Sequence, residues 1–165
     1  MLATPKIAPC LWFDDRAEEA ARFYVGIFKS SRLVDISRYS DAGQEVHGRP
    51  PGSVMAVSFE LEGQPFTALN GGPLFTFSEA ISFQVHCESQ EEVDYYWNRL
   101  SAGGDPNAQQ CGWLKDKFGL SWQVVPTTLL QMLMDADSPK SKRAMNAMLQ
   151  MKKLDIGALE RAYAG

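Results

Sequence analysis

An internal repeat constrains this chain more than any other feature, because two similar halves are expected to build two similar structural units. Residues 13–24 read FDDRAEEAARFY and align with residues 86–97, which read HCESQEEVDYYW. Further along each half, EGQPFTAL aligns with KFGLSWQVV, and this alignment matches Gly63 with Gly119. In both halves the hydrophobic pattern predicts the order strand, helix, strand, strand, strand. Two βαβββ modules of this kind can pair their curved sheets around a shared cavity.

The repeat also sets the expected domain organisation of the 165 residues. We predict an α+β fold in which a first βαβββ module covers residues 1–78 and a second covers residues 79–126, followed by a helical C-terminal tail over residues 127–165. The two modules are expected to form a curved mixed sheet around a cavity. A single α+β domain with two coincidentally similar halves remains the alternative.

The tail is rich in methionine at helical spacing. Such side chains can form a plastic interaction surface, or they can pack on the rest of the fold or on a second subunit. We favour packing, because apolar residues at helical spacing usually form the buried side of a helix. The methionines concerned are Met132, Met134, Met145, Met148 and Met151.

Local signals in the first half predict where its elements begin and end. Residues 6–13 are apolar and contain Pro9, which favours an edge strand or a bulge because proline cannot donate a backbone hydrogen bond. Asp14 or Asp15 is placed to cap the helix that follows. Residues 41–53 are polar and rich in glycine and proline, so a long loop is expected there.

Strand and helix signals also define the second half. Ser89 with Glu92 three residues later forms the pattern of a capping box, which predicts the start of a helix. Alternation along the preceding strand predicts that Ile81, Phe83 and Val85 pack under this helix. The intervening side chains are then expected to face the cavity.

Composition excludes several classes of protein. The net charge is −4, so the chain lacks the overall basic character expected of nucleic-acid-binding proteins, and no apolar run reaches the length of a membrane span. Three cysteines, Cys10, Cys87 and Cys111, show no paired spacing, and no secretory signal is visible, so we expect a cytoplasmic protein. A solvated helix face explains the basic residues of the tail, which are Lys140, Lys142, Arg143, Lys152 and Lys153.

Several stretches together resemble a known superfamily. They are FDDRAEEAARFYVGIF, GSVMAVSFELEGQPFTALNGGP, FTFSEAISFQVHCESQEEVDYYWNRLSAGG, QCGWLKDKFGLSWQVVP and AMLQMKKLDIGALERAY, which cover most of the chain. The chain resembles the vicinal-oxygen-chelate superfamily, which includes glyoxalases, extradiol dioxygenases and antibiotic-resistance proteins. Within it, the resemblance is to the PhnB-like branch, labelled 3-demethylubiquinone-9 3-methyltransferase-like. The resemblance implies the fold but not the activity, because the fold hosts many chemistries.

Enzymes of this superfamily usually hold one divalent metal with His and Glu side chains on the first and last strands of the modules. Carried over to this chain, the positions fall near Lys6 or Ile7, and at Thr67, Ala80 and Gln123. None is His, Asp or Glu, and Gln is a poor ligand for a catalytic transition metal. We therefore expect no metal and no other cofactor. The label's methyltransferase activity lacks support as well, because both strand-to-helix junctions are acidic and free of glycine.

The remaining expectation is an apolar cavity with a few neutral hydrogen-bonding groups. This lining suits a small, weakly polar ligand, and we predict a metal-free small-molecule-binding protein that forms a homodimer. The alternative is a divergent enzyme of the same superfamily, or the labelled methyltransferase, acting on a small quinone-like or dicarbonyl compound. Gln84 and Gln123 can equally be a structural amide pair, and His86 can be a structural histidine. The expected lining comprises Trp12, Thr67, Asn70, Ser82, Gln84, His86, Ser121 and Gln123.

Overall fold

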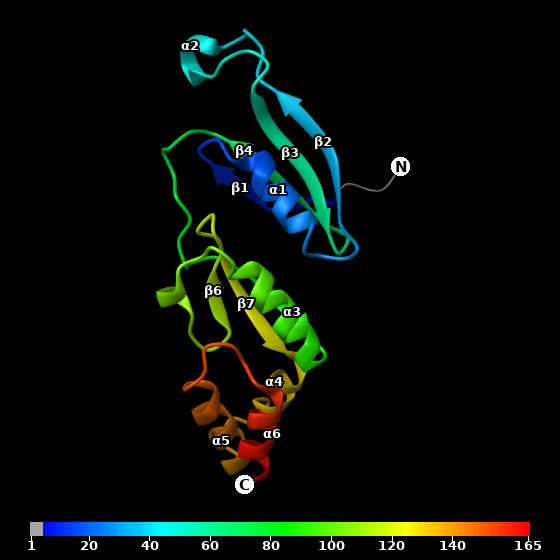
Figure 1. Ribbon diagram of the computed structural model, residues 1–165, viewed down its shortest axis with the longest axis vertical. Coiled ribbons are helices and arrows are strands. Elements are labelled where there is room, and N and C mark those ends of the chain that lie inside the picture. The colour runs from blue at the N-terminus through cyan, green and yellow to red at the C-terminus, as the bar shows by residue number, and fades with distance from the viewer. Residues whose placement is uncertain (1–4) are drawn as a thin grey trace. The chain divides into compact units, whose positions relative to one another are not determined.

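The computed structural model describes residues 5–165 and divides the chain into two compact units. The first unit ends at Thr76, and the second runs from Phe77 to Gly165. Their strands form two separate open sheets with no pairing between them, and each unit carries its own covering helix (Figure 1). The α+β class is confirmed, in the form of two small mixed sheets rather than a closed barrel.

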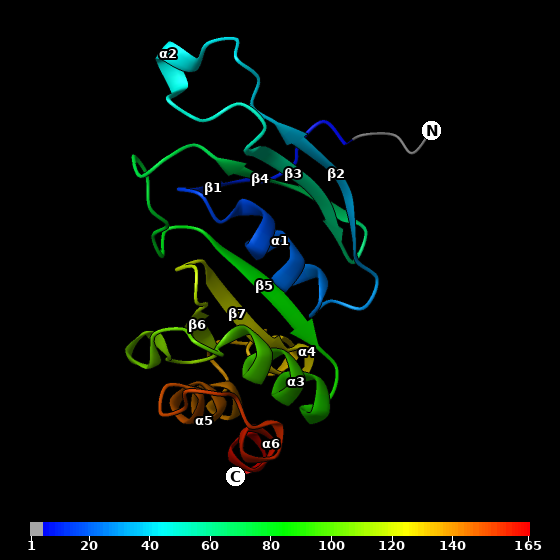
Figure 2. The same ribbon diagram turned by 45° about the horizontal axis from the view of Figure 1, so that its top comes forward.

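The first unit is a four-stranded sheet in the order β1-β4-β3-β2. Strand β1 pairs with β4 in parallel, and the other neighbours are antiparallel. Figure 2 shows helix α1 running along one face of this sheet, with the short helix α2 at its far end. The elements are β1 (Cys10–Phe13), α1 (Ala17–Val25), β2 (Arg32–Arg38), α2 (Gln44–His47), β3 (Val54–Leu61) and β4 (Gln64–Asn70).

Small residues allow α1 to lie close to this sheet. Ala17, Ala20, Ala21 and Tyr24 are buried on one side of the helix, as the helical spacing predicts. The tyrosine ring stacks on Phe59 with ring centroids 6.3 Å apart. Alternation along β3 and β4 thus gives each strand one face toward α1 and one face away from it.

The second unit repeats the pattern in shorter form. Its sheet has three strands in the order β5-β7-β6, in which β5 and β7 are parallel and β6 and β7 antiparallel. Between α3 and β6 the chain forms a 3₁₀ turn and an isolated bridge from Gln110 to Trp113, in place of an extended strand. The elements are β5 (Ser82–Cys87), α3 (Gln90–Leu100), η1 (Pro106–Ala108), β6 (Trp113–Lys115) and β7 (Ser121–Pro126).

The tail forms three helices, α4 (Thr127–Met132), α5 (Pro139–Met148) and α6 (Ile156–Ala164). They pack around a small core of Leu129, Leu154 and Leu159. Met132, Met148 and Met151 pack against this core, whereas Met134 and Met145 are exposed. The tail is therefore held mainly as a packed element of the second unit, with part of its methionine surface open.

Backbone pairing fixes the tail to the rest of the second unit. The amides of Cys111 and Gly112 donate to the carbonyls of Met151 and Lys152, both at 2.8 Å. The Gln90 side chain donates to the Leu154 carbonyl at 3.2 Å. These contacts satisfy backbone groups just before β6, in the unit that lacks a counterpart of β2, the second strand of the repeat.

The starts of β1, α1 and α3 can be compared with the positions predicted from the sequence. Strand β1 is an edge strand, as predicted, but it begins directly after Pro9 and does not contain it. Ser89 caps α3 by accepting from the Glu92 amide at 3.3 Å, also as predicted. The cap predicted at Asp14 or Asp15 is wrong, because the first amide of α1 donates to a side chain of β4 instead.

Two further expectations are corrected in the loop and in the strand that follows the connector. The expected loop at residues 41–53 contains α2, whose ends are two glycines with positive φ. Ile81 is 69% exposed, because it precedes the first residue of β5 and so lies outside the sheet. It does not pack under α3.

Candidate functional site

The first unit separates the three residues that were expected there to line a cavity. Thr67 lies on the face of β4 that points away from α1, opposite Cys10. Trp12 is half-buried, donates from its indole to the Gly72 carbonyl at 2.8 Å, and packs edge to face on Phe75 with 4.9 Å between ring centroids. Neither the indole nor the threonine faces the helix.

Asn70 belongs to the opposite face, beneath the start of α1. Its Oδ1 accepts from the Ala17 amide at 2.8 Å, and its Nδ2 donates to the Val54 carbonyl at 3.1 Å. The side chain is 6% exposed, so both polar atoms are bonded inside the protein. Asn70 therefore provides the helix cap that the sequence pattern had assigned to an aspartate.

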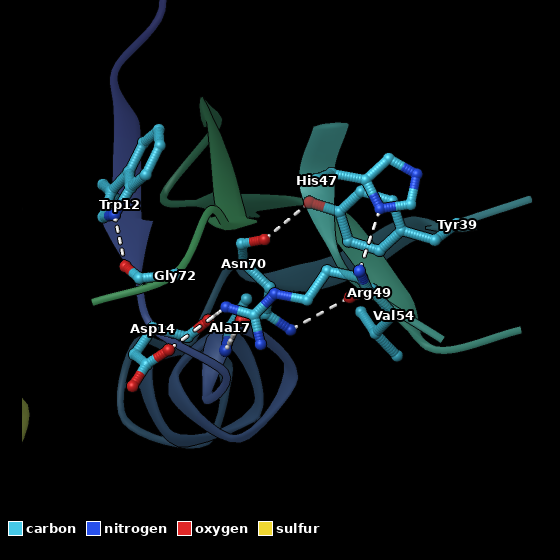
Figure 3. A network of polar contacts seen from close by, with 9 residues as sticks. All are labelled: Trp12, Asp14, Ala17, Tyr39, His47, Arg49, Val54, Asn70 and Gly72. Carbon is cyan, nitrogen blue, oxygen red and sulfur yellow. Dashed lines mark hydrogen bonds and ion pairs between the residues drawn. The ribbon is translucent and has the colours of Figure 1, made fainter. Parts of the chain in front are cut away.

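Several polar contacts lie around Asn70 and are drawn in Figure 3. The Tyr39 hydroxyl donates to the Asn70 carbonyl at 2.7 Å, and Arg49 donates from Nη2 to the Asp14 carbonyl at 2.6 Å and to its carboxylate at 3.1 Å. A pocket of about 230 Å³ opens beside these contacts. Its lining combines charged residues of both signs with apolar surface, and comprises Asp15, Glu18, Arg49, Pro50, Ser53, Val54 and Asn70.

The second unit brings together all five of its expected lining residues. The parallel register of β5 and β7 places Ser82 beside Ser121 and Gln84 beside Gln123. His86 follows on the same face of β5, two residues beyond Gln84, and is exposed. The other face carries the buried Trp122 and Val124, as the alternation predicts. The candidate site is thus the sheet face that points away from α3.

Two amides and one hydroxyl on this face form a hydrogen-bonded row, here called the amide strip and consisting of Ser82, Gln84 and Gln123. Gln123 donates from Nε2 to the Ser82 hydroxyl at 2.8 Å. Gln84 donates from Nε2 to the side-chain oxygen Oε1 of Gln123 at 3.4 Å. Gln84 is exposed and Gln123 is half-buried. The strip has no net charge and retains unused donors and acceptors at its exposed end.

Residues that the sequence reasoning missed flank the amide strip on β6. Trp113 is paired with Gln123 and Lys115 with Ser121, so both side chains lie on the same face as the strip. Lys115 forms a hydrogen-bonded ion pair with Glu79. The hydrogen bond from Lys115 holds the pKa of the Glu79 carboxyl below its ordinary value. Alternation in WLK, residues 113–115, was the available signal, because Leu114 is the buried residue between them.

The residues at the superfamily's metal positions do not fit a divalent metal. Thr67 and Gln123 provide only neutral oxygen, and Ala80 precedes β5 without any ligand atom. Across residues 5–165, no three His, Cys, Asp or Glu side chains gather where they could hold an ion. We therefore derive no chemistry through a metal at this site.

The cysteines of the two first strands are poorly suited to nucleophilic chemistry. Burial raises the pKa of the Cys87 thiol to about 12, and it also raises the pKa of Cys10. Because the thiolate is the reactive form, Cys87 stays protonated at neutral pH and acts as a small apolar group in its sheet. Cys10 is exposed on the edge strand β1, and the raised pKa of its thiol disfavours the thiolate.

Comparison with known proteins gives a family and a fold. The family model described as 3-demethylubiquinone-9 3-methyltransferase matches residues 5–125. The PhnB protein from Bacillus cereus is 36% identical, with 74% of this chain and 100% of that chain aligned, at a TM-score of 0.63. A comparison with curated proteins finds no match.

More distant solved structures share the fold alone. Protein PA1353 from Pseudomonas aeruginosa is 19% identical over 74% of this chain and 98% of that chain, at a TM-score of 0.56. The fosfomycin resistance protein FosX from Mesorhizobium loti is 17% identical over 80% of this chain and 98% of that chain, at a TM-score of 0.53. Within the described residues, no helix has the length and apolar character to cross a membrane.

Proposed function

The chain belongs to the PhnB-like family described as 3-demethylubiquinone-9 3-methyltransferase, within the vicinal-oxygen-chelate superfamily, and on this premise we propose that it binds a small molecule without a metal. The ligand contacts the face of the second sheet that carries the amide strip. This proposal makes the protein a binding or sequestering protein rather than a metalloenzyme.

One observation carries the proposal: the amide strip is neutral where the superfamily's metal chemistry requires anionic or imidazole ligands. An amide keeps the hydrogen-bonding reach of a carboxylate but contributes no charge to hold a cation. Gln123 donates to Ser82 and accepts from Gln84, so the strip is already ordered for recognition. A preorganised neutral row favours a neutral hydrogen-bonding group on the part of the ligand that it contacts, such as a carboxamide, lactam or carbonyl group.

Exposed apolar side chains support a homodimer. Leu74, Phe75 and Ile81, in the connector between the two sheets, are 73%, 58% and 69% exposed. Large apolar side chains grouped along an exposed segment are typical of a contact with another protein. We propose a second copy of this chain as that partner and a cytoplasmic location, without nucleic-acid or membrane contacts. Light scattering on a variant with all three residues changed to Ser tests the dimer, and an unchanged mass contradicts it.

An enzyme of the same superfamily is the second candidate. Its support is His86, which is exposed on the same face as Gln84 and is the general-base candidate of this site. A quinone-like or dicarbonyl compound held by the amide strip would lie beside the imidazole. Turnover of such compounds that is lost in His86→Gln, while binding persists, supports this candidate.

Nuclear magnetic resonance with a neutral probe tests the binding proposal directly. We expect benzamide to bind with a Kd on the order of 1 mM, typical of a fragment of this size, and to shift the side-chain amide signals of Gln84 and Gln123. Gln123→Leu removes the central amide at similar volume and should weaken binding by about fivefold or more.

Thr67→Val is the matched control, because Thr67 occupies the position in the first unit that corresponds to Gln123. Both residues lie four positions after the turn glycine of their module. Binding should be unchanged in this variant. Equal loss in both variants, or no shift at Gln84 and Gln123 in the wild-type protein, contradicts the proposal.

A further inference from the structure

An ion pair crosses the sheet face that carries the amide strip. Lys115 lies on β6, directly paired with Ser121 of the central strand β7. Its partner Glu79 lies three residues before Ser82, the residue that flanks Ser121 on the other side. The pair therefore joins the two edges of the sheet and spans the central strand at the level of Ser121.

Ser121 is buried beneath this level and is left without a hydrogen-bond partner. Its side chain is on the same face as Lys115 and Ser82, and the residue is only 1% exposed. Within residues 5–165 nothing bonds its Oγ. A buried hydroxyl that makes no hydrogen bond costs free energy, so a hydroxyl in this state on the strand position paired with Lys115 indicates a partner that arrives with a ligand.

The two members of the ion pair are held very differently. Glu79 is 63% exposed and precedes the sheet, whereas Lys115 is 26% exposed and is fixed by strand pairing on β6. An ion pair with such an exposed member is weak and is easily exchanged. The fixed partner is therefore the lysine, and the replaceable partner is the carboxylate.

Trp113 supplies an apolar surface next to this position. It is two residues from Lys115 on the same face of β6, half-buried, and paired with Gln123. A planar ligand that lies against the indole would thus have the amide strip at one side and the lysine at the other. An aromatic wall beside a few convergent polar groups is typical of small-ligand sites.

We propose that Lys115 and Ser121 bind the carboxylate of a small, planar carboxylic acid, and that Glu79 occupies this subsite in the absence of the ligand. The incoming carboxylate replaces that of Glu79 on the Lys115 ammonium and accepts the hydrogen bond of the Ser121 hydroxyl. Trp113 and the amide strip hold the body of the ligand. This inference rests on the proposed function, because it concerns the same sheet face.

Glu79 itself is the reason for choosing a carboxylate. It shows that a carboxylate reaches the Lys115 ammonium with hydrogen-bonding geometry from the direction of β5. No covalent bond is made or broken in this exchange, since one ion pair is replaced by another. The neutral strip next to the lysine limits the subsite to a single negative charge.

Benzoate and benzamide form a matched pair of probes, because they have nearly the same shape and differ at the group that would meet Lys115, where the carboxylate is anionic and the amide is neutral with one acceptor replaced by a donor. In the full-length protein, Glu79→Gln removes the internal competitor and should tighten benzoate binding by about two- to fivefold. Lys115→Met should weaken benzoate by about fivefold or more and leave benzamide within about twofold, and Lys115→Arg should restore most of the benzoate affinity. Ser121→Ala should weaken benzoate by about fivefold, the effect of one lost hydrogen bond.

Lys117→Met is the matched control, because Lys117 is a charged residue of the same hairpin whose ammonium lies over the Phe118 ring. It should leave both affinities unchanged. The carboxylate subsite is overturned if Glu79→Gln leaves benzoate affinity unchanged, or if Ser121→Ala binds benzoate as the wild-type protein does, which would assign the serine to a bound water.

The two proposals fail in different ways. If benzamide does not bind in a Gln123-dependent manner, the proposed function itself falls. If benzamide binds in a Gln123-dependent manner but the benzoate affinity does not change in the Glu79 and Lys115 variants, only the carboxylate subsite is contradicted.

Discussion

The two units solve the same structural problem with different side chains. In the first unit the last hairpin turns at Glu62 and Gly63, both with positive φ, and the Glu62 amide donates to the hydroxyl of the half-buried Ser31 at 3.3 Å. In the second unit the corresponding turn is organised by Asp116, which is 2% exposed. Its carboxylate accepts from the backbone amides of Phe118 and Leu120 and from the indole of Trp122, at 2.8, 3.1 and 2.9 Å.

This difference shows which polar side chains of each unit have a structural role. The first sheet uses Asn70, at the end of β4, to hold the start of its helix, so its polar group is committed to structure. In the second sheet the turn and the helix cap are provided by Asp116 and Ser89 instead. The strand residues Ser82, Gln84 and Gln123 therefore neither hold the turn nor cap the helix, and they are available to contact a ligand.

The largest effect is expected from the turn of the second unit. Asp116→Ala removes the acceptor of three donors, two of them in buried hydrogen bonds, and should lower the free energy of unfolding by about 3 kcal/mol. Glu62→Ala, at the equivalent turn, should change it by less than about 1 kcal/mol, because this side chain is exposed. Urea unfolding measures both values. Similar losses in the two variants would remove the contrast between the turns.

The helix starts provide the next comparison. Asn70→Ala removes both the acceptor for the Ala17 amide and a donor to Val54, and should cost about 2 kcal/mol. Ser89→Ala removes a single cap hydrogen bond and should cost about 1 kcal/mol. Thermal unfolding of the two variants ranks them. A larger loss for Ser89→Ala would show that Asn70 is not the main support of α1.

The smallest effect concerns the attachment of the tail by an exposed ion pair. Hydrogen bonds from Lys153, at 2.6 Å, and from Gln90 hold the pKa of Asp94 below its ordinary value of 3.8. A carboxyl with a lowered pKa in the folded state adds stability above its unfolded pKa, and loses it as pH falls through the folded value. The midpoint of thermal unfolding should therefore decrease slightly more in wild type than in Lys153→Met between about pH 5 and about pH 2.

Lys152→Met is the control for this measurement. Lys152 is the neighbouring tail residue, and its backbone carbonyl accepts a hydrogen bond from the Gly112 amide, a contact that the substitution leaves in place. Its pH profile should match that of the wild-type protein. Parallel profiles in all three proteins would show that the ion pair with Asp94 does not stabilise the tail.

Local patterns were sufficient to predict the repeat and the faces of the strands. The Ser89 cap follows from a spacing of three residues, and the burial of Trp122 and Val124 follows from strand alternation. The register of β5 and β7 then brought Gln84 and Gln123 together without any further information. These features depend on residues that are close in sequence or repeat at fixed intervals.

Contacts between distant residues could not be predicted in this way. Asn70 caps α1 from 53 positions away, and it competes successfully with two aspartates that lie next to the helix. The ion pair of Lys115 with Glu79 depends on the connector reaching across the sheet, for which the sequence gives no local signal. No local signal in the sequence indicates that the second unit lacks a counterpart of β2, or that the backbone amides of Cys111 and Gly112, just before β6, bond to the tail.

The central claim, that the amide strip binds a small molecule without a metal, is tested most directly by the affinity for benzamide with and without divalent metal. Calorimetric titration should give the same Kd for protein treated with a chelator and for protein supplemented with Mn²⁺ or Zn²⁺, and Gln123→Leu should weaken both equally. A stoichiometric metal in the purified protein, whose removal abolishes binding, would contradict the claim.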